Sequence, residues 1–329
     1  MRPFSYAAPP TIEEAISSLS RTARPLAGGT DLLTLMKAGL SAPERLVAVR
    51  PLLPSRIEKA RDATLIGAGA VLTDIAADVL IRRSYTALAL AAEAAASPQL
   101  RNMATLGGNL LQRPRCWYFR NRHVGCWLKG GETCPAREGE NRQHALFGGT
   151  HCVAVHPSDL APALLALDAM VTVAGPLGQR TLTMDELYAL PQPRRRTETT
   201  LGDNDLIVSI RLPLPDAATR SVYLKAMDRS AFSFALAGVA ALVRTESHER
   251  RIEFARLVLS GVAPIAWRVQ AAEEELTSGE VREALFQRAA DVALEGAMPL
   301  RHNGWKVPLM RALIVNALTR ITATPPAHP

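Results

Sequence analysis

Apolar residues in the first fifty positions alternate between helical and strand-like spacing, which predicts a small α/β unit. Thr11 and Glu14 have the spacing of a capping box, and the apolar positions that follow recur every third or fourth residue. We therefore expect a helix that begins directly after Thr11. A short strand to Ala27, a glycine turn, a helix over 31–38 and a strand over 45–49 complete the unit.

The middle of the chain continues with short elements of both kinds. Thr73 is a candidate helix cap, and Ser158 is a candidate cap for a helix that runs to Leu167. The remaining patterns predict strands over 64–68, 170–174 and 205–213, an alanine-rich helix over 86–96, a turn at 175–178 and a proline-rich linker at 191–204.

The last third of the chain groups its strands before its helices. Strand-like runs cover 221–227, 234–243 and 252–262, and helical runs cover 268–276, 281–294 and 305–320. This order favours an α+β domain over a βαβ repeat. The chain shows no internal repeat and no low-complexity tract.

The composition indicates a globular protein and argues against a membrane or nucleic-acid-binding protein. At 329 residues, 48% hydrophobic and 21% charged, the chain has the composition of a globular protein of two or three domains. It has no apolar run as long as a membrane span, and its amino terminus lacks the apolar region of an export signal. The net charge of +7 comes from 33 Arg and 5 Lys that are spread along the chain. The dense run 194–196 lies in the linker, so nucleic-acid binding is not expected.

All four cysteines, Cys116, Cys126, Cys134 and Cys152, fall within 37 consecutive residues. Four thiolates that converge on one point suit zinc or an iron–sulfur cluster. Their irregular spacing favours the cluster over structural zinc, which prefers Cys-x2-Cys pairs. Two disulfides or four unrelated buried thiols are the remaining alternatives, and disulfides fit poorly in a long chain without a secretory signal.

Two Gly-Gly turns are candidate ligand loops. Gly28 and Gly29 lie between an expected strand and helix, and Gly107 and Gly108 repeat the pattern about eighty residues later, beside Thr105. Glycine lets backbone N–H groups approach an anion, so two such turns could clamp one pyrophosphate. Each turn alone is weak support, and neither is a Walker A loop or a G-x-G-x-x-G fingerprint, which disfavours an NTPase or an NAD-type Rossmann site.

Four motifs in order resemble one known family. The segments Ala-Gly-Gly-Thr-Asp-Leu-Leu at 27–33 and Ala-Thr-Leu-Gly-Gly-Asn-Leu at 104–110, followed by His-Pro-Ser-Asp at 156–159 and Tyr-Leu-Lys at 223–225, resemble the FAD-binding (medium) subunit of molybdenum hydroxylases. The resemblance covers essentially the whole chain. It implies an α+β protein with an FAD-binding domain of the PCMH type over 1–215, made of two α/β subdomains over about 1–55 and 56–215. A carboxy-terminal domain of the CO dehydrogenase flavoprotein type, an antiparallel sheet with helices, would follow over 216–329.

The resemblance also implies roles for individual residues. The FAD contacts would be Leu26, Ala27, Gly28, Gly29, Thr30, Asp31, Leu32 and Leu33 in the pyrophosphate loop, with Thr105, Gly108, Asn109 and Asp159 opposite. Leu206 or Ile207 would pack on the cofactor, and Lys225 would approach the flavin. No catalytic residue is expected on this chain.

About forty residues separate the second Gly-Gly turn from the Ser-Asp pair, and this insertion at about 112–155 contains every cysteine. It is similar to the insertion that holds a [4Fe-4S] cluster in the FAD subunits of bacterial periplasmic aldehyde oxidoreductase and of 4-hydroxybenzoyl-CoA reductase. The resemblance thus implies Cys116, Cys126, Cys134 and Cys152 as cluster ligands. The nearby His123, His144, His151 and His156 are expected to be outer hydrogen-bond donors or surface residues.

On this resemblance the chain is expected to be an oxidoreductase subunit, the middle of an αβγ heterotrimer. A [2Fe-2S] small subunit and a molybdenum-cofactor large subunit would carry out aldehyde or heterocycle oxidation. Electrons would pass through FAD to an acceptor such as ferredoxin, quinone or oxygen, and Arg113, Arg115, Arg120 and Arg122 could form its docking face. The compartment could be cytoplasmic or periplasmic, with export on a twin-arginine-bearing partner. A zinc-binding structural subunit without a redox role is the rival, and a free-standing FAD oxidoreductase is a second one.

Overall fold

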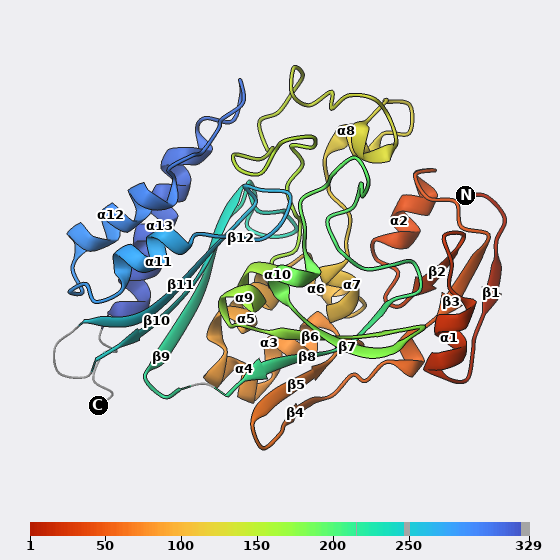
Figure 1. Ribbon diagram of the computed structural model, residues 1–329, viewed down its shortest axis with the longest axis horizontal. Coiled ribbons are helices and arrows are strands. Elements are labelled where there is room, and N and C mark those ends of the chain that lie inside the picture. The colour runs from red at the N-terminus through yellow and green to blue at the C-terminus, as the bar shows by residue number, and fades with distance from the viewer. Residues whose placement is uncertain (215, 247–250, 324–329) are drawn as a thin grey trace.

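The computed structural model describes residues 1–214, 216–246 and 251–323 and contains three sheets in that part of the chain (Figure 1). The first is a parallel sheet at the amino-terminal end, in the order β1-β3-β2. Its elements are β1 (Ser5–Ala7), α1 (Ile12–Ser18), β2 (Ala23–Leu26), α2 (Leu32–Lys37) and β3 (Arg45–Ala48), with the short helix η1 (Arg50–Leu52) behind them. The Thr11 side chain caps α1 by accepting from the Glu14 amide, as the capping pattern predicts.

The second sheet is antiparallel and five-stranded, in the order β4-β5-β8-β6-β7. Its strands are β4 (Ile57–Lys59), β5 (Ala63–Gly67), β6 (Met170–Gly175), β7 (Gly178–Thr183) and β8 (Leu206–Pro213). Its helices are α3 (Leu72–Ala77), α4 (Val79–Ser84), α5 (Thr86–Ala94), α6 (Pro98–Arg101), α7 (Leu106–Leu110), α9 (Leu160–Ala166) and α10 (Met184–Leu187). Because β8 pairs with both β5 and β6, the chain after the cysteines returns to complete a sheet begun before them.

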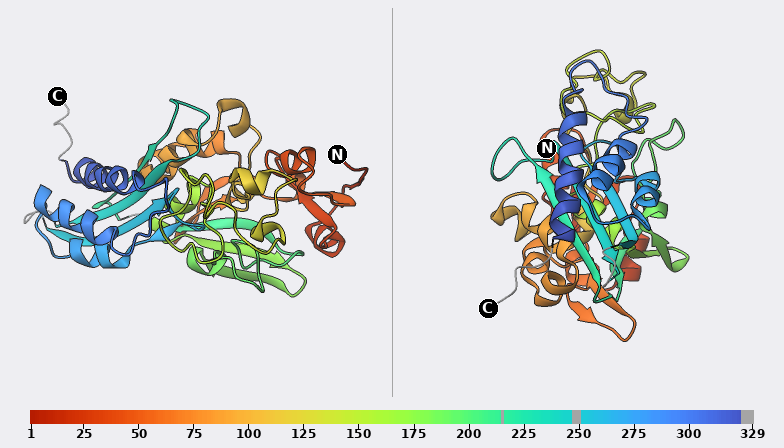
Figure 2. Two further views of the ribbon diagram at one scale, coloured as in Figure 1. Left: turned by 90° about the horizontal axis from the view of Figure 1, so that it is seen from above. Right: turned by 90° about the vertical axis from the view of Figure 1, so that its left-hand side faces the viewer.

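The third sheet is antiparallel, in the order β12-β11-β10-β9, and lies at the opposite end of the molecule from the first (Figures 1 and 2). Its elements are β9 (Thr219–Ala226), β10 (Ala237–Thr245), β11 (Ile252–Ser260), β12 (Trp267–Arg268), α11 (Gln270–Leu276), α12 (Glu283–Ala293) and α13 (Lys306–Thr322). Alternate residues of β10 point to opposite faces, as strand geometry requires. Val239 and Ala241 pack with α11–α13, whereas Ala240 and Leu242 pack with the core of the second sheet, so both faces are buried.

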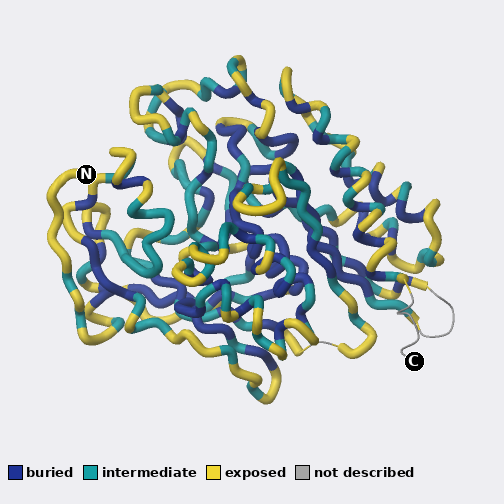
Figure 3. The backbone as a smooth tube through the Cα atoms, turned by 180° about the vertical axis from the view of Figure 1, so that it is seen from behind, coloured by how far each residue is buried: buried dark blue, intermediate teal, exposed yellow. Residues whose placement is uncertain are grey.

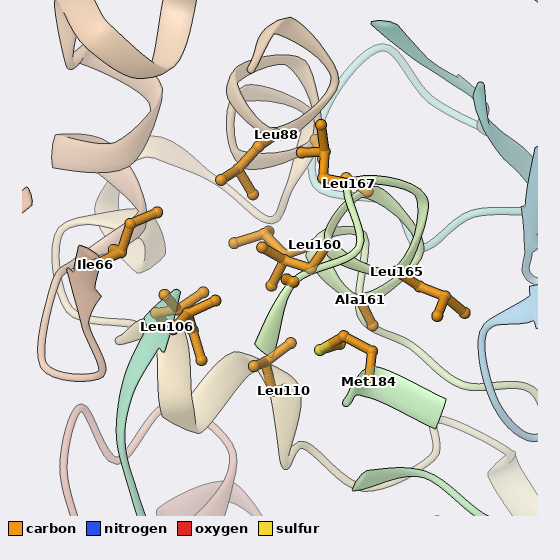
Figure 4. Close-up of a cluster of buried hydrophobic side chains, with 14 of the residues drawn as sticks. Ile66, Leu88, Leu106, Leu110, Leu160, Ala161, Leu165, Leu167 and Met184 are labelled. Carbon is orange, nitrogen blue, oxygen red and sulfur yellow. The ribbon is translucent and has the colours of Figure 1, made fainter. Parts of the chain in front are cut away.

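The largest apolar core surrounds the helices of the second sheet. Leu106 and Leu110 of α7 meet Leu160 of α9 and Leu88 of α5 in this core (Figure 4), and the exposed fraction of each of these side chains is 0%. The buried backbone concentrates in this region and in the third sheet (Figure 3). Close packing here fixes the position of α7.

The α+β class and the antiparallel carboxy-terminal sheet are confirmed, and every expected helix and strand has a counterpart. Thr73 was expected to cap a helix, and this is wrong: α3 begins after Val71, and the Thr73 hydroxyl bonds to Asn102 instead. Four strands were not predicted. The strands β1, β4 and β12 have only two or three residues, which is too few for a clear period, and β7 is mostly polar and exposed. The expected domain boundary at residue 215 and the chain beyond 323 lie outside the described residues. No helix in the described ranges is long and apolar enough to cross a bilayer.

Candidate functional site

The first glycine turn, residues 26–33, connects β2 to α2 and is half-buried throughout. Gly28 packs so closely on the chain before α7 that an added Cβ would overlap the Met103 carbonyl oxygen. Gly29 has a φ of +71°, which favours glycine. The backbone amides of Gly29, Thr30 and Asp31 donate no hydrogen bond within the described part of the chain. The turn therefore presents free N–H donors, which is what an anion requires.

The second glycine turn, residues 104–110, differs from the first because its amides are already bonded. Thr105 caps α7 by accepting from the Gly108 amide at 3.3 Å, and the Gly107 amide donates to Ala68 at 3.0 Å. The side-chain oxygen Oδ1 of Asn109 accepts from Ser158 Oγ at 2.5 Å, which leaves the side-chain NH2 group of Asn109 as a donor. This turn therefore offers the side-chain amide of Asn109 and a backbone surface without side chains at the two glycines. It does not offer a second row of free backbone N–H groups.

Two adjoining cavities meet where the glycine turns approach each other. The large cavity, about 520 Å³, lies between the first sheet and β8, and its lining includes residues 24–32, Thr105 and Ile207. The small cavity, about 320 Å³, lies between α7 and the loop from β9 to β10, and its lining includes Asn109 and Asp159. The residues that line both are Thr30, Asp31, Gly108 and Gln112. Thr30 and Asp31, two of the three residues with free amides, thus border both cavities, and Gly29 borders the large one.

Asp159 lines the small cavity, and a buried network of hydrogen bonds holds its carboxylate in place. It accepts from Lys225 Nζ at 2.8 Å and from the Tyr223 hydroxyl at 2.7 Å, and Lys225 also donates to the Ala94 carbonyl at 3.0 Å. Complete burial raises the pKa of Asp159, and the Lys225 charge opposes that rise. Lys225 lines neither cavity and reaches the small one only through Asp159.

Several residues that line the cavities carried no signal in the sequence. The loop from β9 to β10 brings Arg229 and the exposed aromatic residues Phe232 and Phe234 to the small cavity. Glu198, buried in the large cavity, pairs with Arg113 at 3.2 Å, and burial raises the pKa of its carboxyl. A single exposed phenylalanine or a buried glutamate is unremarkable in a linear sequence, so only the folded chain identifies them.

The cysteine segment, residues 112–155, forms loops at the top of the view in Figure 1 and contains two short helices, α8 (Trp117–Arg120) and η2 (Trp127–Lys129). Its four cysteines are free thiols that pack in one apolar cluster with Phe119, Trp127 and Leu35. The cluster therefore brings together all four residues that the sequence groups. Among residues 1–214, 216–246 and 251–323, however, no three His, Cys, Asp or Glu side chains are arranged to hold a metal ion. The ligand role of the thiols stays a prediction.

Burial is the main cause of the pKa shifts in the thiol cluster. It raises the pKa of Cys116 to about 11 and raises the pKa of Cys152 as well. His144 Nε2 lies 3.2 Å from the Cys116 sulfur, and burial lowers the pKa of this histidine to about 4. Neutral His144 can therefore donate one hydrogen bond to that sulfur at pH 7. His151 is exposed and stacks on Trp127, as an outer residue.

The arginines before and after Cys116 face inward rather than toward solvent. Asp31 accepts from Arg115 at 2.7 Å and from Arg120 at 2.8 Å, and Arg113 pairs with Glu198. Their side chains are between 16% and 28% exposed. A docking face for an acidic protein needs accessible charge, so three of the four expected arginines do not form one.

Comparison with known proteins places the chain among flavoprotein subunits. Residues 2–215 match the family described as the FAD binding domain in molybdopterin dehydrogenase, and residues 222–323 match the CO dehydrogenase flavoprotein C-terminal domain. The aldehyde oxidoreductase FAD-binding subunit of Escherichia coli is 38% identical over 98% of this chain and 99% of its own length. The carbon monoxide dehydrogenase medium chain of Hydrogenophaga pseudoflava is 27% identical, over 96% of each chain.

Solved structures agree with the sequence relatives. A structure of carbon monoxide dehydrogenase from Hydrogenophaga pseudoflava superposes with a TM-score of 0.76 at 26% identity and covers 97% of each chain. Quinoline 2-oxidoreductase from Pseudomonas putida 86 gives a TM-score of 0.75 at 22% identity, which supports the fold alone. It covers 98% of this chain and 97% of that one.

Proposed function

The chain belongs to the FAD-binding medium subunits of the molybdenum hydroxylases, and we propose that it carries FAD and a [4Fe-4S] cluster in an aldehyde oxidoreductase or xanthine dehydrogenase-type enzyme. In this proposal the FAD receives electrons from [2Fe-2S] clusters on a partner and delivers them to an external acceptor. The observation that supports it most is the pair of cavities joined at the free amides of the first glycine turn.

The shape and chemistry of the cavities fit FAD. A dinucleotide has two ring systems joined by a pyrophosphate, and the chain offers two chambers joined by N–H donors. Gly29, Thr30 and Asp31 would donate to the phosphate oxygens from the first turn, and Asn109 would donate from the second. The absence of a side chain at Gly28 lets the first turn pack against the chain before α7, and Gly108 adds no side chain to the lining that the two cavities share.

The remaining predicted residues would shape the chambers. Ile207 is 3% exposed and lines the large cavity, where it would pack on a ring. Asp159 lines the small cavity, and Lys225 and Tyr223 hold its carboxylate in place. Bound FAD supplies electron transfer in one- or two-electron steps, while the protein contributes binding and orientation. In the proposal, Lys225 acts on the flavin through Asp159 rather than by contact.

The four cysteines support the iron–sulfur part of the proposal through their chemistry. They are four free thiols in one apolar pocket, with a neutral histidine beside one sulfur and cationic side chains around Phe119. Thiolate ligands and hydrogen bonds to sulfur are what such clusters use. In the described residues the four sulfurs are not arranged around a common point as metal ligands would be. The proposal therefore requires the sulfurs to move toward one another when the iron–sulfur cluster is inserted.

The remaining parts of the proposal follow from the relatives. One relative is named as a subunit of an aldehyde oxidoreductase and another as a chain of carbon monoxide dehydrogenase. We therefore propose a [2Fe-2S] small subunit and a molybdenum-cofactor large subunit as partners, with oxidation of an aldehyde on the large one. The acceptor, of the ferredoxin, quinone or oxygen class, and the compartment, cytoplasm or periplasm, belong to the same proposal.

Analysis of the purified full chain tests both cofactors. We expect one flavin, four irons and four acid-labile sulfides per chain. Cys134→Ser should lower the iron and sulfide content while the flavin remains. The control variant Ser55→Ala, at an exposed position that lines neither cavity and lies outside the thiol cluster, should keep all three. Flavin without iron would contradict the cluster, and the absence of flavin would contradict the proposal as a whole. A colourless chain with bound zinc would support the zinc-binding alternative, which the family assignment does not favour.

A further inference from the structure

Asp31 links the first glycine turn to the cysteine segment. Its Oδ2 atom accepts from the Arg113 amide at 2.8 Å, and its Oδ1 atom accepts from Arg115 Nη1 at 2.7 Å and Arg120 Nη2 at 2.8 Å. The Asp31 side chain is 14% exposed. Within the described ranges, no other side chain of residues 26–33 makes a hydrogen bond or ion pair with the cysteine segment.

The far side of this contact reaches the thiol cluster. The guanidinium groups of Arg113 and Arg120 lie 5.2 Å and 5.8 Å from the centre of the Phe119 ring. Phe119 is buried and packs directly among Cys126, Cys152 and their apolar neighbours. A displacement of either arginine would therefore disturb the Phe119 ring and, through it, the packing of the sulfurs, because protein interiors are closely packed.

The near side of the contact reaches both cavities. The free amides of Gly29, Thr30 and Asp31 belong to the same turn as the Asp31 carboxylate, and Asp31 lines both chambers. Arg115 also lines the small cavity, where its guanidinium lies 4.9 Å from the Phe234 ring. One carboxylate thus fixes the turn that would hold a pyrophosphate and the arginines that border the cysteines.

We propose that Asp31 is a positioning residue that couples the two sites, so that FAD in the cavities and the closed state of the thiol cluster favour each other. This inference rests on the proposed FAD function. The coupling is reciprocal by thermodynamic necessity: if an intact cysteine segment strengthens FAD binding, bound FAD stabilises the cysteine segment by the same factor. The Asp31 charge serves this link and is balanced by Arg115 and Arg120, so it does not repel a phosphate.

The coupling is tested on the full chain by comparing how alkylation of the thiols changes FAD affinity in the unsubstituted chain and in single variants. The affinity for FAD is measured by flavin fluorescence quenching, before and after the four thiols are stripped of metal and alkylated with iodoacetamide. Alkylation should weaken FAD binding to the unsubstituted chain by at least about fivefold, the lower end of ordinary coupling between sites. Asp31→Asn should bind FAD more weakly from the start and should lose little further affinity on alkylation.

The matched control is Asp203→Asn. Asp203 also lines the large cavity and forms an ion pair, with Arg24 at 2.8 Å, but it does not touch the cysteine segment. This variant should respond to alkylation as the unsubstituted chain does. Arg120→Met removes the other end of the link and should behave like Asp31→Asn, which keeps the test decisive if one variant folds poorly.

The outcomes separate the inference from the proposed function. An equal response to alkylation in Asp31→Asn and in the unsubstituted chain would overturn the coupling while FAD binding stands. An unsubstituted chain that binds no FAD would overturn the proposed function, and the coupling with it.

Discussion

Gly28 is the residue on which the approach of the two glycine turns depends most. A Cβ at this position would overlap the Met103 carbonyl oxygen, which is backbone and cannot rotate away. We expect Gly28→Ala to lower the free energy of unfolding by about 1–3 kcal/mol, as other overpacked sites do. Because the turn must shift, FAD affinity should fall at least about tenfold in fluorescence titrations.

Gly202 provides the control for Gly28. It lines the same large cavity, but its added Cβ would meet only the Asp205 carboxylate at an ordinary 3.4 Å. Gly202→Ala should therefore retain both stability and FAD affinity. If the two alanine variants were equally damaged, general sensitivity of the cavity rather than the turn contact would explain the loss.

Because His156 is buried, we expect the folded chain to lose stability in acid. Burial lowers its pKa to about 4, whereas in the unfolded chain it is near 6.5, so between these values the unfolded state binds the extra proton. Stability from this group is complete above pH 6.5 and declines as the pH falls toward 4, by about 3 kcal/mol in all. Urea unfolding over this range should show a shallower pH slope for His156→Gln, and an unchanged slope would contradict the assignment.

Among elements, α13 and the loop before it hold the cysteine segment from the carboxy-terminal side. Asn303, which is 0% exposed, donates to the His144 and Ala145 carbonyls at 3.1 Å each. Lys306, also buried, donates to the His144 carbonyl at 3.0 Å. The residue that bonds the Cys116 sulfur is thus fixed by an element more than 150 residues later in the chain.

Asn303→Ala should lower the free energy of unfolding by about 2–3 kcal/mol, because the Ala145 carbonyl loses its donor and the Leu300 amide loses its acceptor, while Lys306 still donates to the His144 carbonyl. It should also speed alkylation of Cys116 by loosening His144. The control is Asn316→Ala, an exposed position on α13, which should change neither the urea midpoint nor the alkylation rate. An Asn303→Ala chain with unchanged stability would show that this anchor contributes little.

The elements also show what the sequence could predict. The strands β9–β11 and the helices α11–α13 followed from their apolar period, whereas the two-residue strand β12 did not. The glycine turns followed from their Gly-Gly pairs. The free amides of the first turn and the bonded Gly107 amide of the second did not, because the partner of Gly107, the Ala68 carbonyl, depends on tertiary packing. The inward position of Arg115 and Arg120 was likewise unpredictable, since Asp31 lies more than eighty residues away.

At the scale of the whole molecule, the candidate site depends on contacts between segments that are far apart in the sequence. The strand β8 carries Ile207 to the large cavity only because it pairs with β5 and β6, and β9 carries Lys225 to Asp159 only because the third sheet packs on α5 and α9. The two cavities therefore lie between parts that are distant in sequence. Cofactor binding should consequently stabilise the entire chain rather than one part.

FAD should raise the thermal midpoint of the full chain in a single transition. At a free concentration one hundred times the dissociation constant, the expected gain in free energy of unfolding is about 2.7 kcal/mol. Calorimetry with FAD and, as a control, with riboflavin, which lacks the pyrophosphate, checks this. Equal stabilisation by both compounds would contradict a site built on phosphate contacts.

The most direct measurement is an experimental structure of the chain purified with its flavin. We predict one ring system in each cavity and the pyrophosphate between them, with phosphate oxygens about 2.7–3.2 Å from the amides of Gly29, Thr30 and Asp31. A flavin bound elsewhere, or one whose phosphates do not touch the first glycine turn, would contradict it.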